Sequence, residues 1–186
     1  MSRITAINYE SAQGKAKELL DAVNAKLGMT PNMMKTMAQS PAVLDAYLKF
    51  SDALSHGTLS GKLREQIALI AAEENGCGYC ASAHTAIGKM VGLDEAAILA
   101  AREGNSANAS DDAALKFARQ VIANRGQVGE TDLAAVKAAG FTDGEIGEIV
   151  GAVALNIFTN YFNEIAQTEI DFPAIEFPLS RRAANA

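Results

Sequence analysis

The sequence of 186 residues has few of the side chains that usually carry chemistry, with only two cysteines and two histidines. It also has no run of Lys or Arg, and 16 basic against 22 acidic residues give a net charge of −6. Without a basic stretch, neither a nucleic acid nor an anionic membrane is expected as a partner. The length fits a single domain that buries a substantial core.

Long apolar runs are also missing. Hydrophobic residues make up 49% of the chain, but charges interrupt every run before the roughly eighteen residues that a membrane span needs. The N-terminal stretch MSRITAINYESAQGKAKELL lacks the apolar segment of a secretory signal. We therefore expect a cytoplasmic protein, in which a close cysteine pair is more often catalytic or metal-binding than a permanent structural disulfide.

Apolar residues recur at helical spacing through most of the chain, and no segment shows the alternation of a strand. The pattern predicts an all-α fold of about eight helices. Helical stretches are expected over residues 10–27, 31–38, 41–55, 61–74, 77–90, 95–103, 111–124, 130–139 and 143–167. Serine and aspartates of the polar loop GNSANASDD are expected to cap the helix at 111–124. We expect one domain over 1–186, with 1–9 as an N-terminal arm and 171–186 as a non-helical tail because of its prolines.

The stretch from Glu65 to His84 holds both cysteines and one histidine. In a helix, residues three, four and seven apart share a face, so Cys77, Cys80 and His84 are expected on one stripe. The turn dipeptide Asn75-Gly76 places Cys77 at the start of that helix. Unpaired N–H groups and the helix dipole stabilise a thiolate there, which on this argument alone favours Cys77 as the more activated thiol.

Two thiols beside an imidazole suit redox chemistry. A thiolate that attacks a peroxide becomes a sulfenic acid, and a second nearby thiol condenses with it to a disulfide. His84 could accept or shuttle the proton, and Glu65, at the head of an otherwise apolar strip, could orient the imidazole. By comparison, Glu73 and Glu74 are expected at the exposed end of the same helix.

The run LSGKLREQIALIAAEENGCGYCASAHTAIGKMVGL resembles the core of the alkylhydroperoxidase D-like group of the carboxymuconolactone decarboxylase superfamily. Its signature is a Glu, then a CxxC pair and a His four residues further on, which Glu65, Cys77, Cys80 and His84 match position by position. Flanking segments extend the similarity over about residues 25 to 170. The better-known members often have a His just before the second Cys, where this chain has Tyr79.

The resemblance implies an all-helical homo-oligomer, usually a trimer or hexamer, that reduces organic hydroperoxides or hydrogen peroxide. It implies that Cys80 is the peroxidatic thiol and Cys77 the resolving thiol, with His84 and Glu65 as a proton relay. Tyr79 would line the pocket, where its phenol could donate a hydrogen bond. The expected reductant is a dithiol protein, lipoyl-bearing or thioredoxin-like, and no cofactor or metal is required.

Two other interpretations use the same residues. Three of the four ligands of a zinc site are present, and a fourth would come from Glu65, His56 or another subunit, in a non-enzymatic redox-sensing or zinc-binding module. Alternatively, the thiols are inert core residues of a structural oligomer.

Two repeated patterns lie outside the signature. A group of methionines at helical spacing is expected to fill the core rather than to form a channel: Met33, Met34 and Met37. A row of asparagines on the last helix is expected either to form hydrogen bonds across a subunit seam or to be ordinary surface polarity: Asn156, Asn160 and Asn163.

Overall fold

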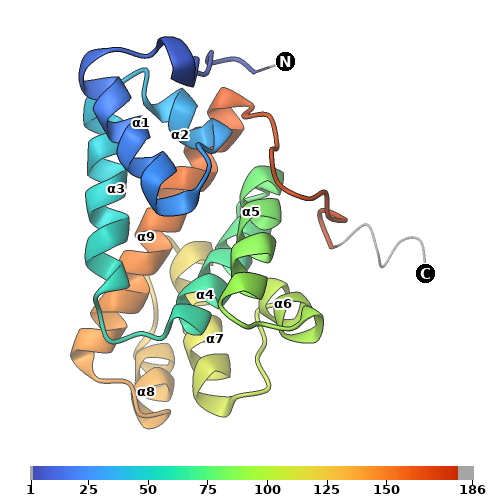
Figure 1. Cartoon of the computed structure of the whole chain (residues 1–186). Helices are drawn as coiled ribbons and strands as arrows, with labels where there is room; N and C mark the ends of the chain where they lie inside the picture. Colours follow the sequence, from blue (N-terminus) through green and yellow to red (C-terminus); the bar gives the residue numbers. More distant parts are fainter. Residues whose placement is uncertain (1, 180–186) are drawn as a thin grey trace.

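The computed structural model describes residues 2–179, and within this range the chain is all-α, as predicted, with no strand (Figure 1). The described helices are α1 (Gly14–Leu27), α2 (Asn32–Met37), α3 (Pro41–Ser55), α4 (Gly61–Glu74), α5 (Gly78–Met90), α6 (Glu95–Arg102), α7 (Ala109–Ala123), α8 (Glu130–Ala138) and α9 (Asp143–Ala166). These nine helices of the described range correspond one by one to the nine helical stretches expected, although the fold was predicted to have about eight helices. None of them combines the length and apolar character needed to cross a membrane.

The first helix starts later than predicted. Tyr9–Ser11 form a short 3-10 turn, and the α-helix begins only at Gly14 rather than at residue 10. Gly14 has a φ of 57°, a left-handed conformation that glycine adopts readily and that interrupts a continuous right-handed helix. The run of helix-forming side chains in this region gave no sign of that interruption.

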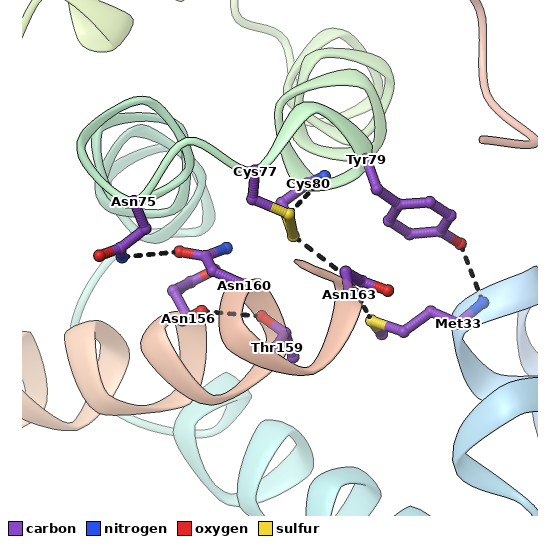
Figure 2. The surroundings of a disulfide bond; sticks show 9 residues. All are labelled: Met33, Asn75, Cys77, Tyr79, Cys80, Asn156, Thr159, Asn160 and Asn163. Atoms are coloured by element: carbon purple, nitrogen blue, oxygen red, sulfur yellow. Dashed lines mark hydrogen bonds between the residues drawn. A yellow bond between two sulfur atoms is a disulfide. The ribbon is translucent and has the colours of Figure 1, made fainter. Parts of the chain in front are cut away.

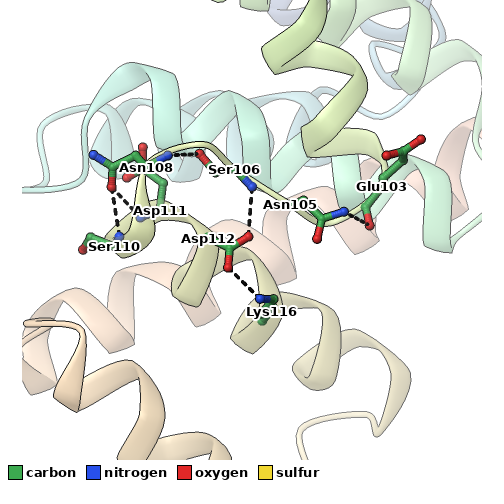
Figure 3. A network of polar contacts seen from close by, with 8 residues as sticks. All are labelled: Glu103, Asn105, Ser106, Asn108, Ser110, Asp111, Asp112 and Lys116. Carbon is green, nitrogen blue, oxygen red and sulfur yellow. Dashed lines mark hydrogen bonds and ion pairs between the residues drawn. The ribbon is translucent and has the colours of Figure 1, made fainter.

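The cap of α7 also differs from the prediction. Asn108 is the N-cap, and its side chain accepts hydrogen bonds from the backbone N–H groups of Ser110 and Asp111 at 2.9 and 3.0 Å (Figure 3). Asp112, which was expected to help cap the helix, instead accepts from the backbone N–H of Ser106 at 3.0 Å and pairs with Lys116. The asparagine satisfies the unpaired N–H groups of the first turn before the serine and aspartates reach them.

The core consists of two apolar clusters, and helices α4 and α9 contribute residues to both of them. One cluster packs α4, α6, α7, α8 and the first half of α9 together, and the other packs α1, α2 and α3 against the start of α5. Helix α9 is the longest and contacts α3, α4, α5 and α7 along its length (Figure 1). The three methionines at 33, 34 and 37 are buried in the second cluster, as expected of core residues, but Met33 and Met34 also line a cavity beside α5.

After α9 the chain runs back past α5 (Figure 1), and residues 171–179 form no helix. The remainder of the predicted tail and Met1 of the predicted arm lie outside the described residues. A buried ion pair between Arg102 Nε and Glu73 Oε2, at 2.9 Å, anchors this segment. Arg102 also donates to the Glu176 carbonyl oxygen at 2.9 Å, and Glu73 accepts from the Leu179 N–H at 2.6 Å. The expectation that Glu73 is exposed was therefore wrong, because the returning chain covers it.

We predict that Arg102→Ala lowers the free energy of unfolding by about 3 kcal/mol, since it leaves the Glu73 carboxylate poorly compensated in a partly buried site. The matched control is Arg119→Ala, which removes the neighbouring but more exposed ion pair with Glu74 and should cost at most about 1 kcal/mol. Urea unfolding of both variants measures the difference. Equal losses in the two variants would show that the anchor adds no stability of its own.

Candidate functional site

Helix α5 begins with the cysteine pair. Gly76, with a φ of 72°, turns the chain out of α4, and Cys77 follows as the N-cap of α5. Its sulfur accepts a hydrogen bond from the backbone N–H of Cys80 at 3.3 Å (Figure 2). The Cα atoms of the two cysteines lie 5.3 Å apart, and a disulfide joins their sulfurs. The sulfur pair therefore lies directly on the free N–H groups of a helix N-terminus.

The two cysteines differ in what surrounds them. Cys80 lines a cavity of about 360 Å³ enclosed by α1, α2, α3, α4, α5 and α9, and most of the lining is apolar. Cys77 is 0% exposed and is not part of that lining. On the outer side of α5, the ring of Phe177 from the returning chain lies only 3.4 Å from where a Cβ atom would stand on Gly78. Of the two sulfurs, only that of Cys80 borders the cavity.

Glu65 and His84 form a hydrogen-bonded pair in the same cavity. His84 Nδ1 lies 2.7 Å from Glu65 Oε2, and both side chains are mostly buried. An ionised carboxylate only accepts, so Nδ1 carries the proton, and in the neutral ring Nε2 is left unprotonated. The geometry presents Nε2 as the base of the pair and Glu65 as the group that fixes its tautomer.

Tyr79 lies at the cavity wall and joins three segments. Its hydroxyl donates to Asp171 Oδ1 at 2.9 Å and accepts from the backbone N–H of Met33 at 3.2 Å. The other oxygen of Asp171 accepts from the backbone N–H of Asn32 at 2.7 Å. The phenol and the carboxylate therefore hold the start of α2 and the returning chain against α5, a tethering contact that the sequence did not reveal.

Both phenols that line the cavity are neutral over the ordinary pH range. Burial raises the pKa of Tyr79 well above its usual value. Burial, with a smaller contribution from the negative charge of Glu65, raises the pKa of Tyr47 to about 12. Each phenol therefore acts as a hydrogen-bond donor or acceptor and contributes no charge to the cavity.

The asparagine row on α9 is buried, so the prediction that it lies at a subunit seam or on the surface was wrong. Asn156, Asn160 and Asn163 are 6%, 0% and 2% exposed and face the inside of the chain. Asn163 Nδ2 donates to Cys80 Sγ at 3.3 Å and to Met33 Sδ at 3.2 Å (Figure 2). Their spacing of four and three places all three on one helical face, but it does not show whether that face is buried.

The geometry does not bring the remaining candidate ligand to the site. His56 is at the C-terminal end of α3 with its side chain 75% exposed, and its Nδ1 lies 2.9 Å from the Asp52 carbonyl oxygen. It is not among the residues that line the cavity. In this disulfide-bonded form, no group of three His, Cys, Asp or Glu side chains within residues 2–179 is placed to hold a metal ion.

Within the described residues, the fold and the site together define an all-α protein with a CxxC disulfide at a helix N-terminus, in which Cys80 and the Glu65–His84 pair line one mostly apolar cavity. Residues 41–124, which include the Glu65, CxxC and His84 positions, match the model of the carboxymuconolactone decarboxylase family. A search of curated protein sequences found no match.

Solved structures share the fold over nearly the whole chain. An alkylhydroperoxidase AhpD core, a peroxidase-related protein from Ralstonia eutropha JMP134, is 24% identical with a TM-score of 0.82, and the match covers 91% of this chain and 92% of that one. A peroxidase-related protein from Silicibacter sp. TM1040 is 23% identical with a TM-score of 0.78, covering 90% and 92%. The debrominase Bmp8, in complex with 2,3,4-tribromopyrrole, is 20% identical with a TM-score of 0.78, covering 92% of each chain. The family match over residues 41–124 and the shared fold support the resemblance to the AhpD-like, carboxymuconolactone decarboxylase superfamily that the sequence indicated.

We predict that Tyr79→Phe lowers the free energy of unfolding by about 1–3 kcal/mol, because it leaves the Met33 N–H and the Asp171 carboxylate short of a partner. Folding raises the pKa of Tyr79 above the ordinary tyrosine value of 10.0. The stability that its protonated phenol contributes is therefore fully present below pH 10. Above that pH the unfolded chain loses the proton first, so stability should fall, and the variant should show a shallower fall.

Chemical denaturation at several pH values between neutrality and the alkaline limit tests this. Tyr161→Phe, at an exposed phenol of α9, is the control and should stay within about 0.5 kcal/mol of the parent. A Tyr79→Phe protein with parental stability and parental alkaline slope would refute the tethering role.

Proposed function

We propose that this protein is a thiol-dependent peroxidase that reduces organic hydroperoxides or hydrogen peroxide through a Cys77/Cys80 dithiol and disulfide cycle. The observation that carries the proposal is the position of Cys80. Its sulfur is bridged to Cys77 at a helix N-terminus and borders the same cavity as the hydrogen-bonded Glu65 and His84. The family match over residues 41–124 and the fold shared with peroxidase-related proteins support the same reaction class.

The cycle begins with the reduced pair. His84 Nε2 takes the proton of the Cys80 thiol, and the thiolate attacks one oxygen of the peroxide, which breaks the O–O bond. The departing alkoxide takes the proton from His84 and leaves as an alcohol, while Cys80 becomes a sulfenic acid. Glu65 stabilises the imidazolium formed between these two steps.

The second half of the cycle closes and reopens the disulfide. The Cys77 thiol attacks the sulfenic sulfur of Cys80, and one water is released as the disulfide forms. An external dithiol then supplies two electrons and two protons by thiol–disulfide exchange. Its oxidised product is a disulfide, so sulfur, oxygen and protons balance over the cycle.

Access to the cavity supports the order of the two thiols. The helix N-terminus favours Cys77, whose sulfur already accepts from the Cys80 N–H. However, Cys77 is fully covered, and a peroxide in the cavity meets only Cys80. We therefore assign Cys80 as the peroxidatic thiol and Cys77 as the resolving thiol.

The proposed partners follow from the same chemistry. A dithiol protein, lipoyl-bearing or thioredoxin-like, is the proposed reductant in a cytoplasmic setting. We further propose a homo-oligomer. Apolar side chains left exposed along α9 offer a surface for a second copy: Val150, Phe158, Tyr161 and Ile165.

We predict that Cys80→Ser abolishes hydroperoxide consumption, because it removes the attacking sulfur. Cys77→Ser should consume one equivalent and stop as a sulfenic acid, which a dimedone probe detects by mass spectrometry. Turnover of cumene hydroperoxide and of hydrogen peroxide by the parent and by Cys80→Ser is followed with dithiothreitol as the reductant, whereas Cys77→Ser is reduced beforehand and assayed after the reductant has been removed. Parental turnover in Cys80→Ser would refute the proposal.

The main alternative is a non-enzymatic module that senses oxidants or holds zinc through the same cluster. Metal analysis of protein purified without chelator distinguishes it from the peroxidase. Stoichiometric zinc that blocks titration of both thiols would favour the module, while metal-free protein that turns over hydroperoxide many times per chain would favour the enzyme.

We predict that Glu65→Gln and His84→Ala each lower kcat/KM by about 100-fold, because each disables the same proton relay. Residues that act as one unit are not additive, so the double variant should be no slower than the His84→Ala variant. Glu74→Gln, at an exposed position of the same helix, is the control and should keep the parental rate. Independent, multiplicative losses in the double variant would contradict a shared relay.

A further inference from the structure

The sulfur of Cys80 has a hydrogen-bond donor that no part of the CxxC signature supplies. Asn163 lies in the last turn of α9, and its Nδ2 is 3.3 Å from Cys80 Sγ (Figure 2). The donor is 83 residues away in sequence and 2% exposed. The amide oxygen of Asn163, Oδ1, is buried and has no hydrogen-bond partner among the described residues. No other group among them therefore holds the amide through this oxygen.

We propose that Asn163 is a positioning residue that holds the Cys80 sulfur through its amide N–H and stabilises the Cys80 thiolate in the reduced protein. This inference deepens the proposed function, and the catalytic role of Asn163 rests on that function. The effect of Asn163 on the Cys80 thiolate does not rest on it, because this effect is a property of the reduced protein alone.

The two sulfurs have two different donors. The backbone N–H of Cys80 points to Cys77 Sγ, whereas the amide of Asn163 points to Cys80 Sγ, both at 3.3 Å. Without the amide, the helix N-terminus alone would make Cys77 the preferred thiolate. Asn163 supplies the opposing donor, so that the thiol that borders the cavity is also the one that ionises.

Burial makes this contact strong in the reduced state. A hydrogen bond to an ionised acceptor is roughly twice as strong as one between neutral groups, and a site shielded from water increases the difference. The other acceptor of this NH2 group, Met33 Sδ at 3.2 Å, is an uncharged thioether and a weak acceptor. A thiolate on Cys80 is therefore the stronger of the two acceptors of the amide.

The geometry also provides a matched control on the same helix. Asn160 is 0% exposed and lies three residues before Asn163, but its recorded hydrogen bond is with Asn75 Nδ2 at 2.9 Å and not with a sulfur. Replacing either asparagine removes a buried amide from α9. Only replacing Asn163 removes the donor to Cys80.

The experiment follows thiolate formation by its ultraviolet absorbance as pH rises, in reduced protein that carries Cys77→Ser, so that Cys80 is the only thiol. Asn163→Ala should raise the midpoint pH of this titration by about one unit or more, equivalent to a tenfold lower thiolate population. Asn163→Asp, which keeps the shape but places a carboxylate beside the sulfur, should raise it further. Asn160→Ala should leave the midpoint where it is.

The other titratable and charged groups that face the cavity are Tyr47, Arg64, Glu65, Tyr79 and His84, and every variant in this comparison retains them. A second background, Cys80→Ser, leaves Cys77 as the only thiol, and there Asn163→Ala should not move the midpoint. Circular dichroism confirms that each variant is folded, and the isosteric Asp variant carries the test if the Ala variant unfolds.

Equal midpoints for the Asn163 and Asn160 variants, or an equal shift of Cys77, would overturn the inference. The titration uses no peroxide, so its failure is distinct from failure of the proposed function. A protein with the Asn163-dependent midpoint that consumes no hydroperoxide would contradict the peroxidase and leave the thiolate assignment intact. A protein that turns over hydroperoxide but whose midpoint pH does not depend on Asn163 would contradict the thiolate assignment and leave the peroxidase proposal intact.

Discussion

The site depends on one local constraint, the use of Cys77 as the N-cap of α5. An N-cap residue is extended while the next residues are helical, so its side chain folds over the first turn. This brings the Cys77 sulfur onto the Cys80 N–H and to the Cys80 sulfur, with the Cα atoms 5.3 Å apart. Gly76 makes the approach possible because its left-handed φ of 72° turns the chain sharply out of α4.

The polar groups around the sulfur pair need hydrogen-bond partners because the pair is buried. A polar cluster inside an apolar core must have its hydrogen bonds supplied from nearby elements. Helix α4 supplies Glu65 for His84, α9 supplies the Asn163 amide, and the returning chain supplies Asp171 for Tyr79. Segments far apart in sequence therefore meet at α5 for one physical reason.

Much of the fold could be predicted from the sequence because it depends on local rules. Apolar periodicity predicted the helices, and the spacing of Glu65, Cys77, Cys80 and His84 predicted the candidate residues. The errors arose where a backbone conformation or a distant segment decided the outcome. Gly14 delayed α1, and the chain after α9 covered Glu73. The burial of the α9 asparagines depends on which face of that helix meets α5, which a single helix does not reveal.

The central claim is that Cys77 and Cys80 form one reversible couple that an oxidant in the cavity closes. Its most direct test is mass spectrometry of the fully reduced protein after one equivalent of hydroperoxide, without reductant. The account predicts a mass loss of two hydrogens, loss of both free thiols, and a single peptide-mapped bridge between Cys77 and Cys80. Retention of both thiols, or oxidation that stops at one sulfur with the other still free, would contradict it.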